Sequence, residues 1–406
     1  MLRILVHLDT VSYCPRSWRE ANSPHMLGRR CAAALARSTR LHYYSTAPDA
    51  FSALEHKMWQ AGADAYASTF GKVTAQATNE LMDAAGVHLT KAMAVSIVEK
   101  TPLESREAGL RVLDVATGPG MIADAVAARG HAEVVALDFS PEMLRVAQSV
   151  VDKHPDGCVK LLEGDASALK LPDNSFDAVI IGFGLLHLPK PQLALAEAFR
   201  VLKPGGILSY SVWEEPARGN LAFEILLDAL AAHGSKEASL PATADGEPLP
   251  FFHFASAEKA TPMLVEAGFK KESVRFSVVP TAASLRNEDE LFEMFATATA
   301  RSRALLEQQS DAQLGAIKGA MAAKITKHFS GTWQGRLGAD GTWDATNAMH
   351  AGGRAHEYPG AEEKIHVVAS FGSSLGGPAA GTQWMGGRFK HIVPMPAVIA
   401  SAQKPV

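Results

Sequence analysis

Cysteine, long apolar runs and unbalanced charge are all scarce in this chain of 406 residues. Its three cysteines, Cys14, Cys31 and Cys158, form no CxxC pair and no cluster with metal-ligand spacing. This favours a reducing compartment without structural disulfides. No apolar run is long enough to cross a bilayer, so we expect no transmembrane segment. The net charge of -4 gives no electrostatic reason to expect a nucleic-acid partner.

The first 50 residues contain no lysine and few acids. They hold seven arginines and three acidic residues. An N-terminus that is rich in arginine, contains serine and is poor in acids is typical of organellar transit peptides. The stretch RLHYYS resembles a mitochondrial presequence cleavage context, with the cut near Tyr43–Ser45. We expect residues 1–50 to be a mitochondrial targeting peptide. The alternative is a disordered extension or a misassigned start, with the protein in the cytoplasm.

Residues 331–388 show neither helical nor strand periodicity. Thirteen of the 33 glycines fall within 331–387. A loop of this length without structure is uncommon in a compact domain. We interpret it as a flexible insertion or a gene-model error, placed between a domain at 51–330 and a C-terminal strand of the same domain at 389–406. Pro394 and Pro396 interrupt that strand, so we expect it at an edge or a bulge.

From Arg111 onward, short apolar runs alternate with segments of helical spacing. Strands are predicted at 111–115, 133–138, 158–163, 176–183, 206–213 and 272–280. Helices are predicted at 119–129, 141–153, 190–201, 220–235 and 257–267, with helical spacing also at 51–86 and one or two helices in 287–328. This order predicts an α/β fold with a Rossmann-like, doubly wound, mostly parallel sheet. The segments 51–86 and 215–330 would supply a helical cap.

The stretch after the first predicted strand fits two classes of ligand. Gly118 to Ala123 match the dinucleotide pattern G-x-G-x-x-G/A, and Asp138 lies where an acid would take a ribose hydroxyl. Glycines there allow a sharp turn and a close approach of the backbone to a ligand. Asp114 distinguishes between a dinucleotide and S-adenosyl-L-methionine, because a carboxylate there would repel a pyrophosphate but attract an ammonium or a sulfonium. The residues therefore favour S-adenosyl-L-methionine over NAD, and an NAD-dependent oxidoreductase is the less favoured alternative.

Four motifs in succession carry a family resemblance. DVATGPG, ALDFS, GDASALKLPDNSFDAV and RVLKPGGILS, within about 105–215, resemble class I S-adenosylmethionine-dependent methyltransferases. The nearest group includes the ubiquinone/menaquinone C-methyltransferases and many small-molecule methyltransferases. The loop of that family commonly has glycine where this chain has Ala116. We expect Ala116 to be tolerated if it keeps an ordinary φ.

The resemblance implies which residues hold the cofactor, S-adenosyl-L-methionine. Asp114 and the glycine loop would hold its amino-acid end, Asp138 its ribose, and Asp165 with Ala166 its adenine edge. Gly182 and Phe183 would lie near the reactive methyl group. The full set is Tyr66, Asp114, Ala116, Thr117, Gly118, Gly120, Asp138, Phe139, Met143, Asp165, Ala166 and Phe183. Core packing is the alternative for Met143 and Phe183, and turn or cap chemistry is the alternative for the two later acids.

A general base is needed only if the methyl acceptor must lose a proton. His187, just after the fourth predicted strand, is the candidate, with a structural histidine as the alternative. Glu214 and His253 are weaker candidates. The predicted acceptor pocket consists of Trp59, Trp213, Phe252 and His253, with Tyr66 and Phe251 as further aromatic neighbours. Aromatic residues at the ends of elements are as often core residues.

We therefore expect a methyltransferase that acts on a small-molecule acceptor through a carbon, oxygen or nitrogen atom. The alternative is a protein that binds S-adenosylmethionine without methylating, such as an organellar assembly factor. The acceptor and the oligomeric state stay open at this point.

Overall fold

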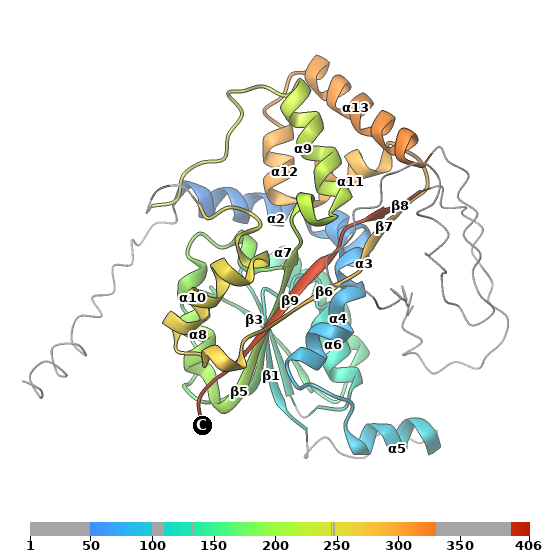
Figure 1. Ribbon diagram of the computed structural model, residues 1–406. Helices are drawn as coiled ribbons and strands as arrows, with labels where there is room; N and C mark the ends of the chain where they lie inside the picture. The colour runs from blue at the N-terminus through green and yellow to red at the C-terminus, as the bar shows by residue number, and fades with distance from the viewer. Residues whose placement is uncertain (1–48, 100–108, 132, 245, 247, 330–390) are drawn as a thin grey trace, which may run out of the picture. The chain divides into compact units, whose positions relative to one another are not determined.

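The computed structural model describes residues 49–99, 109–131, 133–244, 246, 248–329 and 391–406 (Figure 1). Residues 1–48 of the expected targeting segment and the whole of the 331–388 insertion lie outside the described residues. The predictions for those two segments, and the domain boundaries that depend on them, stay predictions.

A seven-stranded sheet forms the centre of the unit that begins at Asp49. Its strand order is β3-β2-β1-β4-β5-β9-β6. The first five strands of the chain are parallel, and β9 pairs antiparallel with both β5 and β6. The strands are β1 (Arg111–Val115), β2 (Glu133–Asp138), β3 (Val159–Glu163), β4 (Phe176–Gly182), β5 (Leu202–Trp213), β6 (Arg275–Val279) and β9 (Ala397–Gln403). The prediction of a doubly wound, mostly parallel sheet is confirmed.

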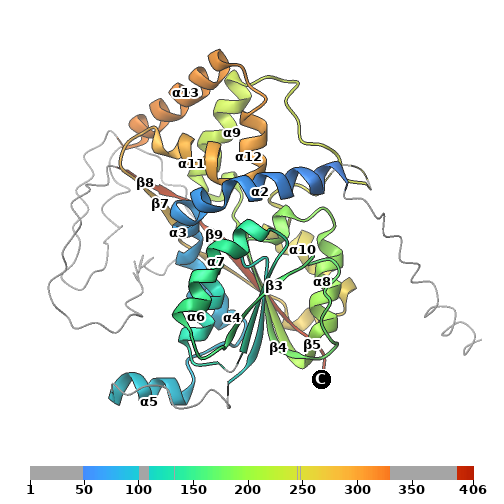
Figure 2. The same cartoon turned by 180° about the vertical axis from the view of Figure 1, so that it is seen from behind.

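Helices cover both faces of this sheet, which is why its central strands are almost continuously apolar. One face carries α4 (Thr78–Ala84), α6 (Met121–Ala128) and α7 (Pro141–Lys153). The other carries α8 (Pro191–Val201) and α10 (Ala257–Ala267), on the opposite side of the sheet in Figure 2. Between these layers, Leu113, Phe176 and Ile180 are fully buried. The described residues also include the helix α5 (Lys91–Glu99) and five short 3-10 helices.

A helical cap lies at the carboxyl ends of the parallel strands. Its first helix, α2 (Ala50–Ser68), crosses the top of the sheet and continues into α3 (Phe70–Thr74) (Figure 1). Helices α9 (Leu221–His233), α11 (Glu290–Ala298), α12 (Ala300–Leu306) and α13 (Asp311–Phe329) lie beyond it. The segment predicted as one or two helices thus forms three. Helix α2 contacts α7 below it and α11 and α12 above it, so it joins the cap to the sheet layer.

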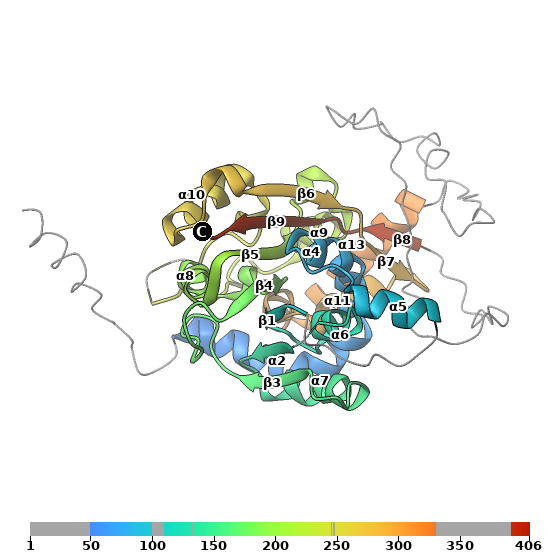
Figure 3. The same cartoon turned by 90° about the horizontal axis from the view of Figure 1, so that it is seen from below.

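The C-terminal segment differs from the expectation of a single strand at an edge or a bulge. It forms two strands: β8 (His391–Pro394) pairs with β7 (Ala282–Leu285) in a separate two-stranded sheet, and β9 enters the main sheet. The edge expectation is wrong for β9, which lies between β5 and β6 (Figure 3). Both prolines precede Ala397, so neither removes a donor from the ladder of β9. The backbone N–H of Met395, between the prolines, donates to the Thr281 carbonyl at 2.8 Å.

Strand β5 begins four residues earlier than the predicted start at 206. The Lys-Pro-Gly-Gly sequence before residue 207 is an irregularity within the strand: the register with β4 shifts between Phe176 and Ala178, and Gly205 has φ of 81°. Lys203 forms an ion pair with Asp177 of β4 at 2.8 Å, which fixes the start of the strand. In the part of the chain that the structure describes, no helix combines the length and apolarity that a membrane crossing requires.

Candidate functional site

The predicted cofactor residues gather where parallel strands end, the usual position of ligand sites in such sheets. Asp114 lies in β1, Asp138 ends β2, and Phe183 follows β4. Strand β1 pairs with β2 on one side and with β4 on the other, so these three residues come from neighbouring strands. The loop from Ala116 to Gly120 joins β1 to α6 among them.

This loop turns through left-handed backbone at three positions. The φ angles are 55° at Ala116, 55° at Gly118 and 85° at Gly120. The condition stated for Ala116, an ordinary φ, is not met. The structure makes room for its methyl group at Gly184, where an added Cβ would lie 2.8 Å from the Ala116 Cβ. The methyl group of Ala116 therefore fits because Gly184, after the neighbouring strand β4, has no side chain. Ala116 still bears the backbone strain that a glycine would avoid.

The two loop glycines serve different purposes. A Cβ on Gly120 would lie 2.9 Å from Val150 Cγ2 and 3.2 Å from Ala147 Cβ, so this glycine allows α6 and α7 to pack closely. A Cβ on Gly118 would meet no heavy atom within 4 Å. Gly118 therefore borders open space, where a ligand can approach the backbone.

Asp114 is fully buried and faces its own loop. Its Oδ2 accepts a hydrogen bond from Thr117 Oγ1 at 2.5 Å, and its Oδ1 has no partner among the described residues. Burial raises the pKa of Asp114 to about 7; the nearby Asp138 adds to the rise, and the hydrogen bond from Thr117 opposes it. The sequence argument against a pyrophosphate assumed an ordinary charged carboxylate. Because this pKa lies near neutrality, that argument is weaker than it first appears.

Asp138 holds the loop from the neighbouring strand. Its Oδ2 accepts from the Gly118 N–H at 2.8 Å, and its Oδ1 accepts from the Ser140 N–H at 2.9 Å. Burial raises the pKa of Asp138 to about 6, against the lowering effect of these amide donors. The turn chemistry named as the alternative is thus present. Each oxygen keeps a second lone pair that can accept from a hydroxyl group.

The residues expected around an adenine ring occupy different environments. Phe139 is 37% exposed, with its ring 5.3 Å from that of His56 on α2. Met143 is buried beside Met58, Trp59 and Ala63, which is the packing of a core residue between α2 and α7. Asp165 is exposed and accepts from the Ser167 N–H at 2.7 Å, as in an Asx turn, and Ala166 is buried.

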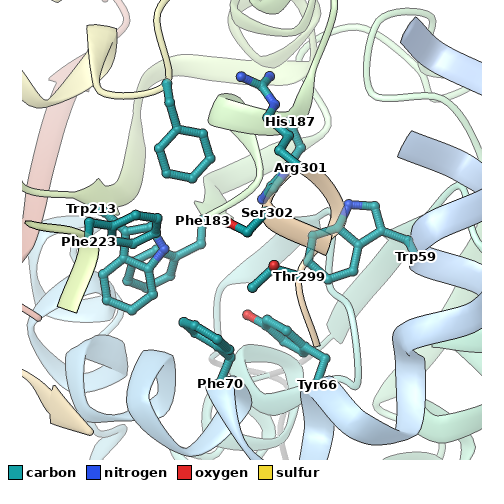
Figure 4. A pocket seen from close by; sticks show the side chains of 11 residues that line it. Trp59, Tyr66, Phe70, Phe183, His187, Trp213, Phe223, Thr299, Arg301 and Ser302 are labelled. Carbon is teal, nitrogen blue, oxygen red and sulfur yellow. The ribbon is translucent and has the colours of Figure 1, made fainter. Parts of the chain in front are cut away.

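An aromatic pocket lies between the strand ends and the cap (Figure 4). Its cavity volume is about 40 Å³. Trp213 and Phe223 stand on one side, opposite Trp59 (Figure 4). The Phe183 and Trp213 rings are 4.4 Å apart, and Phe183 has φ of 54°, a second strained non-glycine residue at the site. The lining residues are Trp59, Tyr66, Phe70, Phe183, His187, Trp213, Phe223, Phe251, Thr299, Arg301 and Ser302.

The pocket contains two of the four residues predicted for it, Trp59 and Trp213. Phe252 and His253 do not line it; Phe251 does. Phe252 packs against Phe223 at 5.4 Å between ring centroids, and His253 is half-buried beside Phe254. The run PFFHF, just before and within η4 (His253–Ala255), thus reaches the pocket through Phe251 instead of Phe252 or His253.

Tyr66 lies at both the glycine loop and the aromatic pocket. It lines the pocket, and its hydroxyl lies 3.3 Å from Thr74 Oγ1. Burial raises its pKa to about 12, with the negative charge of Asp138 adding to the rise. Tyr66 is therefore a neutral hydroxyl group near Asp138, between the glycine loop and the pocket.

His187 lines the pocket and contacts Glu55, which in turn binds Arg301; the sequence analysis predicted neither Glu55 nor Arg301. Its Nδ1 lies 3.1 Å from Oε2 of Glu55 on α2, and Glu55 Oε1 accepts from Arg301 Nε of α12 at 2.9 Å. Glu55 and Arg301 were not predicted because each lies on a helix with no motif around it. The single signal is the spacing of Glu55 and Trp59, one helical turn apart, where Trp59 Nε1 donates to Glu55 Oε2 at 3.1 Å.

The strand-end residues fit an adenosyl ligand. The open space before Gly118 admits it, the buried Asp114 Oδ1 needs a partner that a cationic group would provide, and Asp138 can accept from a ribose. Glu214, a weaker candidate base, accepts from the Glu215 N–H at 2.9 Å and is absent from the pocket wall. The described residues contain no group of three or more histidine, cysteine or acidic side chains that could hold a metal ion.

Comparison with known proteins identifies a methyltransferase domain in this chain. Residues 113–210 match the family described as "Methyltransferase domain". A demethylmenaquinone methyltransferase from Renibacterium salmoninarum is 39% identical over 167 residues, which are 40% of this chain and 65% of that protein. The ubiquinone/menaquinone biosynthesis C-methyltransferase UbiE of Rhodopseudomonas palustris is 45% identical over 102 residues, 24% of this chain and 40% of the relative. The matches thus span less than two thirds of these relatives.

A solved structure, the YcgJ protein of Bacillus subtilis, aligns with 78% of this chain and 98% of its own chain. The sequence identity is 16% and the TM-score 0.38. The strand order given above, rather than this alignment, identifies the fold.

The strain at Ala116 makes a stability prediction. We expect Ala116→Gly to raise the free energy of unfolding by about 1 kcal/mol, because left-handed backbone costs alanine roughly 1–2 kcal/mol and the greater freedom of unfolded glycine offsets only part of the gain. Urea unfolding without ligand measures the effect. As a control, Ala125→Gly within α6 should lower the free energy by about 1 kcal/mol. Equal losses in both variants would show that Ala116 is not strained.

The raised pKa of Asp114 predicts a pH dependence. The folded protein holds this proton more tightly than the unfolded chain does, so stability falls as pH rises from about 4 toward about 7. Asp114→Asn removes the titration. Between about pH 5 and about pH 8, we expect wild type to lose about 2 kcal/mol more unfolding free energy than this variant.

Urea unfolding at several pH values measures this difference. The matched control is Asp152→Asn, which removes an exposed acid on α7 and should leave the pH profile of wild type unchanged. Parallel profiles for wild type and Asp114→Asn would contradict the pKa of about 7.

Proposed function

We propose that this chain, which carries a class I S-adenosylmethionine-dependent methyltransferase domain, transfers a methyl group to a small, largely apolar acceptor. The observation that carries the proposal is the pocket of seven aromatic side chains beside the glycine loop, at the carboxyl ends of the strands. A cofactor held at the loop and an acceptor held in the pocket would meet near Phe183. This residue follows β4 and lines the pocket.

In this function, Gly118 of the loop and the two acids beside it would each contact the cofactor. Gly118 leaves its backbone open to the ligand, and Asp138 accepts from the ribose hydroxyls while its amide partners keep the loop in place. Asp114 offers its unpaired Oδ1 to the positive end of the ligand. When bound, S-adenosylmethionine would supply an activated methyl group to an electron pair of the acceptor, and the electron pair of the broken carbon–sulfur bond would stay on sulfur. Positioning of the two reactants supplies much of the rate.

The acceptor class follows from the pocket wall. Aromatic side chains offer large flat apolar surfaces, and pairs of rings gain energy from offset or edge-to-face contact. A planar aromatic molecule with an ionisable hydroxyl group suits this wall and the neighbouring His187. The two relatives named above act on quinones by their names, which supports a quinol as the first acceptor to test.

His187 would serve as the general base. It lines the pocket, its Nδ1 is bonded to Glu55, and its Nε2 makes no hydrogen bond within the described residues. The proton of the acceptor hydroxyl would pass to Nε2 as the methyl group is transferred, and then to water. Where the methyl group goes to a ring carbon, that carbon would then lose its hydrogen as a proton while the oxygen takes one up, which restores the aromatic ring. A histidine removes such a proton effectively near neutral pH.

The full chain should therefore bind S-adenosylhomocysteine with micromolar affinity and NAD not at all, as calorimetric titration will measure. Asp138→Ala should bind S-adenosylhomocysteine about 10- to 100-fold more weakly, because a charged hydrogen-bond acceptor contributes about 1.5–3 kcal/mol. Asp152→Asn is the control and should bind like wild type. Unchanged affinity in Asp138→Ala would remove the ribose role of that residue.

Transfer is tested with tritiated S-adenosylmethionine and a chemically reduced demethylnaphthoquinone that carries a short isoprenoid chain. Wild type should place the label in the organic extract, and Asp138→Ala should place at least about tenfold less there. Tight binding without transfer to this quinol or to a panel of phenols and amines would favour the non-methylating alternative.

A further inference from the structure

A buried charged cluster joins the cap to the candidate base. Glu55 of α2, His187 of the turn after β4 and Arg301 of α12 come from three separate parts of the chain. Glu55 is 2% exposed and Arg301 is 8% exposed. We infer that Glu55 is the positioning residue of His187: it holds the imidazole with Nδ1 protonated and Nε2 directed to serve as base. This inference rests on the methyltransferase function proposed above.

The protonation of Glu55 decides the direction of its hydrogen bond to His187. Burial by itself would raise the pKa of Glu55, but His187 and Arg301 outweigh it and hold that pKa below its ordinary value. Glu55 is therefore a carboxylate, which can only accept hydrogen bonds. In the neutral imidazole, Nδ1 must then carry the hydrogen, and Nε2 keeps the lone pair that a base needs.

The ring of His187 is also fixed in orientation. The Trp59 ring meets it edge to face at 4.8 Å, and Phe251 lies 6.0 Å away in a second edge contact. Trp59 is itself tied to Glu55 through its indole N–H, so the same carboxylate orients the ring and one of its walls. A base held by an orienting carboxylate is a recurrent catalytic arrangement.

Arg301 keeps Glu55 in place. Its guanidinium donates through Nε to Glu55 and lies over the Phe51 ring, 4.8 Å from the centroid. Because a buried ion pair is often no more stabilising than apolar residues of similar size, the cluster needs a further reason to exist. Positioning of His187 is such a reason. The arrangement is complete only when α2 and α12 are packed over the strand ends, so the cap completes the base.

The test reads the tautomer of His187 directly. The full chain, labelled with ¹⁵N-histidine and saturated with S-adenosylhomocysteine, is examined by two-bond proton–nitrogen NMR above neutral pH. His187→Asn identifies the signals that belong to this ring. Wild type should show the Nδ1–H tautomer at His187. The Nε2–H tautomer in wild type would overturn the inference without any further variant, even if Glu55 variants fail to fold.

Glu55→Gln then removes the charge at constant shape. We expect a mixture of tautomers at His187, an S-adenosylhomocysteine affinity within about twofold of wild type, and a kcat for the quinol about 10- to 100-fold lower with KM within about threefold. Glu133→Gln is the matched control. Glu133 also pairs with two cations, Arg111 and Lys160, but at the start of β2, and its loss should change none of these quantities.

The outcomes separate this inference from the proposed function. An active wild type whose tautomer and kcat are unaffected by Glu55→Gln keeps the function and overturns the positioning role. A wild type that methylates nothing, but whose His187 tautomer depends on Glu55, loses the proposed function and keeps the positioning role. A fall in quinol affinity alone, with kcat and tautomer unchanged, would show that Glu55 shapes the pocket instead and would overturn the inference.

Discussion

Two hydrogen bonds to Asp138 hold the candidate site together. This carboxylate, at the end of β2, accepts hydrogen bonds from the N–H groups of Gly118 and Ser140. It therefore links the loop after β1 to the start of α7. The loop must turn within a few residues from a buried strand into a helix, and it does so through three left-handed residues. Without a fixed acceptor beside it, such a turn would have many alternative conformations. The position of α6, and the open face at Gly118, both depend on this anchor.

The carboxyl group of Asp138 also lies in an electrostatically unfavourable position, next to that of Asp114. Burial raises the pKa of Asp138 to about 6 and that of Asp114 to about 7, and the charge of Asp138 adds to the rise at Asp114. A protein optimised for stability alone would remove one of these acids. A cationic ligand bound between the two carboxylates would relieve their repulsion. This relief would add to the free energy of ligand binding. Strain at Ala116 and Phe183 lies in the same small region.

The sequence was informative where structure depends on neighbouring residues. The bounds of β1, β2 and α7 were predicted to the residue, because apolar runs, the Ser140–Pro141 start and short turns are local signals. The φ of Ala116 was not predictable, since the space for its methyl group is provided by Gly184 in another loop. The internal position of β9 likewise depends on pairing with β5 and β6, which lie far away in the chain.

The site was predicted in the same uneven way. Residues within the four motifs, such as Asp114, Gly118 and Asp138, lie together as expected. Those contributed by the cap were found only where they are aromatic, as with Trp59 and Tyr66. Glu55 and Arg301 read as ordinary charged positions on helices, and nothing local shows that each faces the other across a buried interface. Their pairing is a property of how α12 packs on α2, and α12 is a short helix within a segment whose periodicity predicted its type but not its neighbours.

This division has a physical consequence for the function. The strand ends and the loop, which would hold the cofactor under the proposed function, are built from local sequence and can be shared by many proteins of the same fold. The pocket and the Glu55–His187 pair are built from long-range packing of the cap, which forms no part of the family match at 113–210. Under the proposed function, His187 itself lies within the matched region, whereas Glu55 and much of the pocket wall come from the cap. Similarity in the matched region supports the cofactor, and under the proposed function the cap would select the molecule that receives the methyl group.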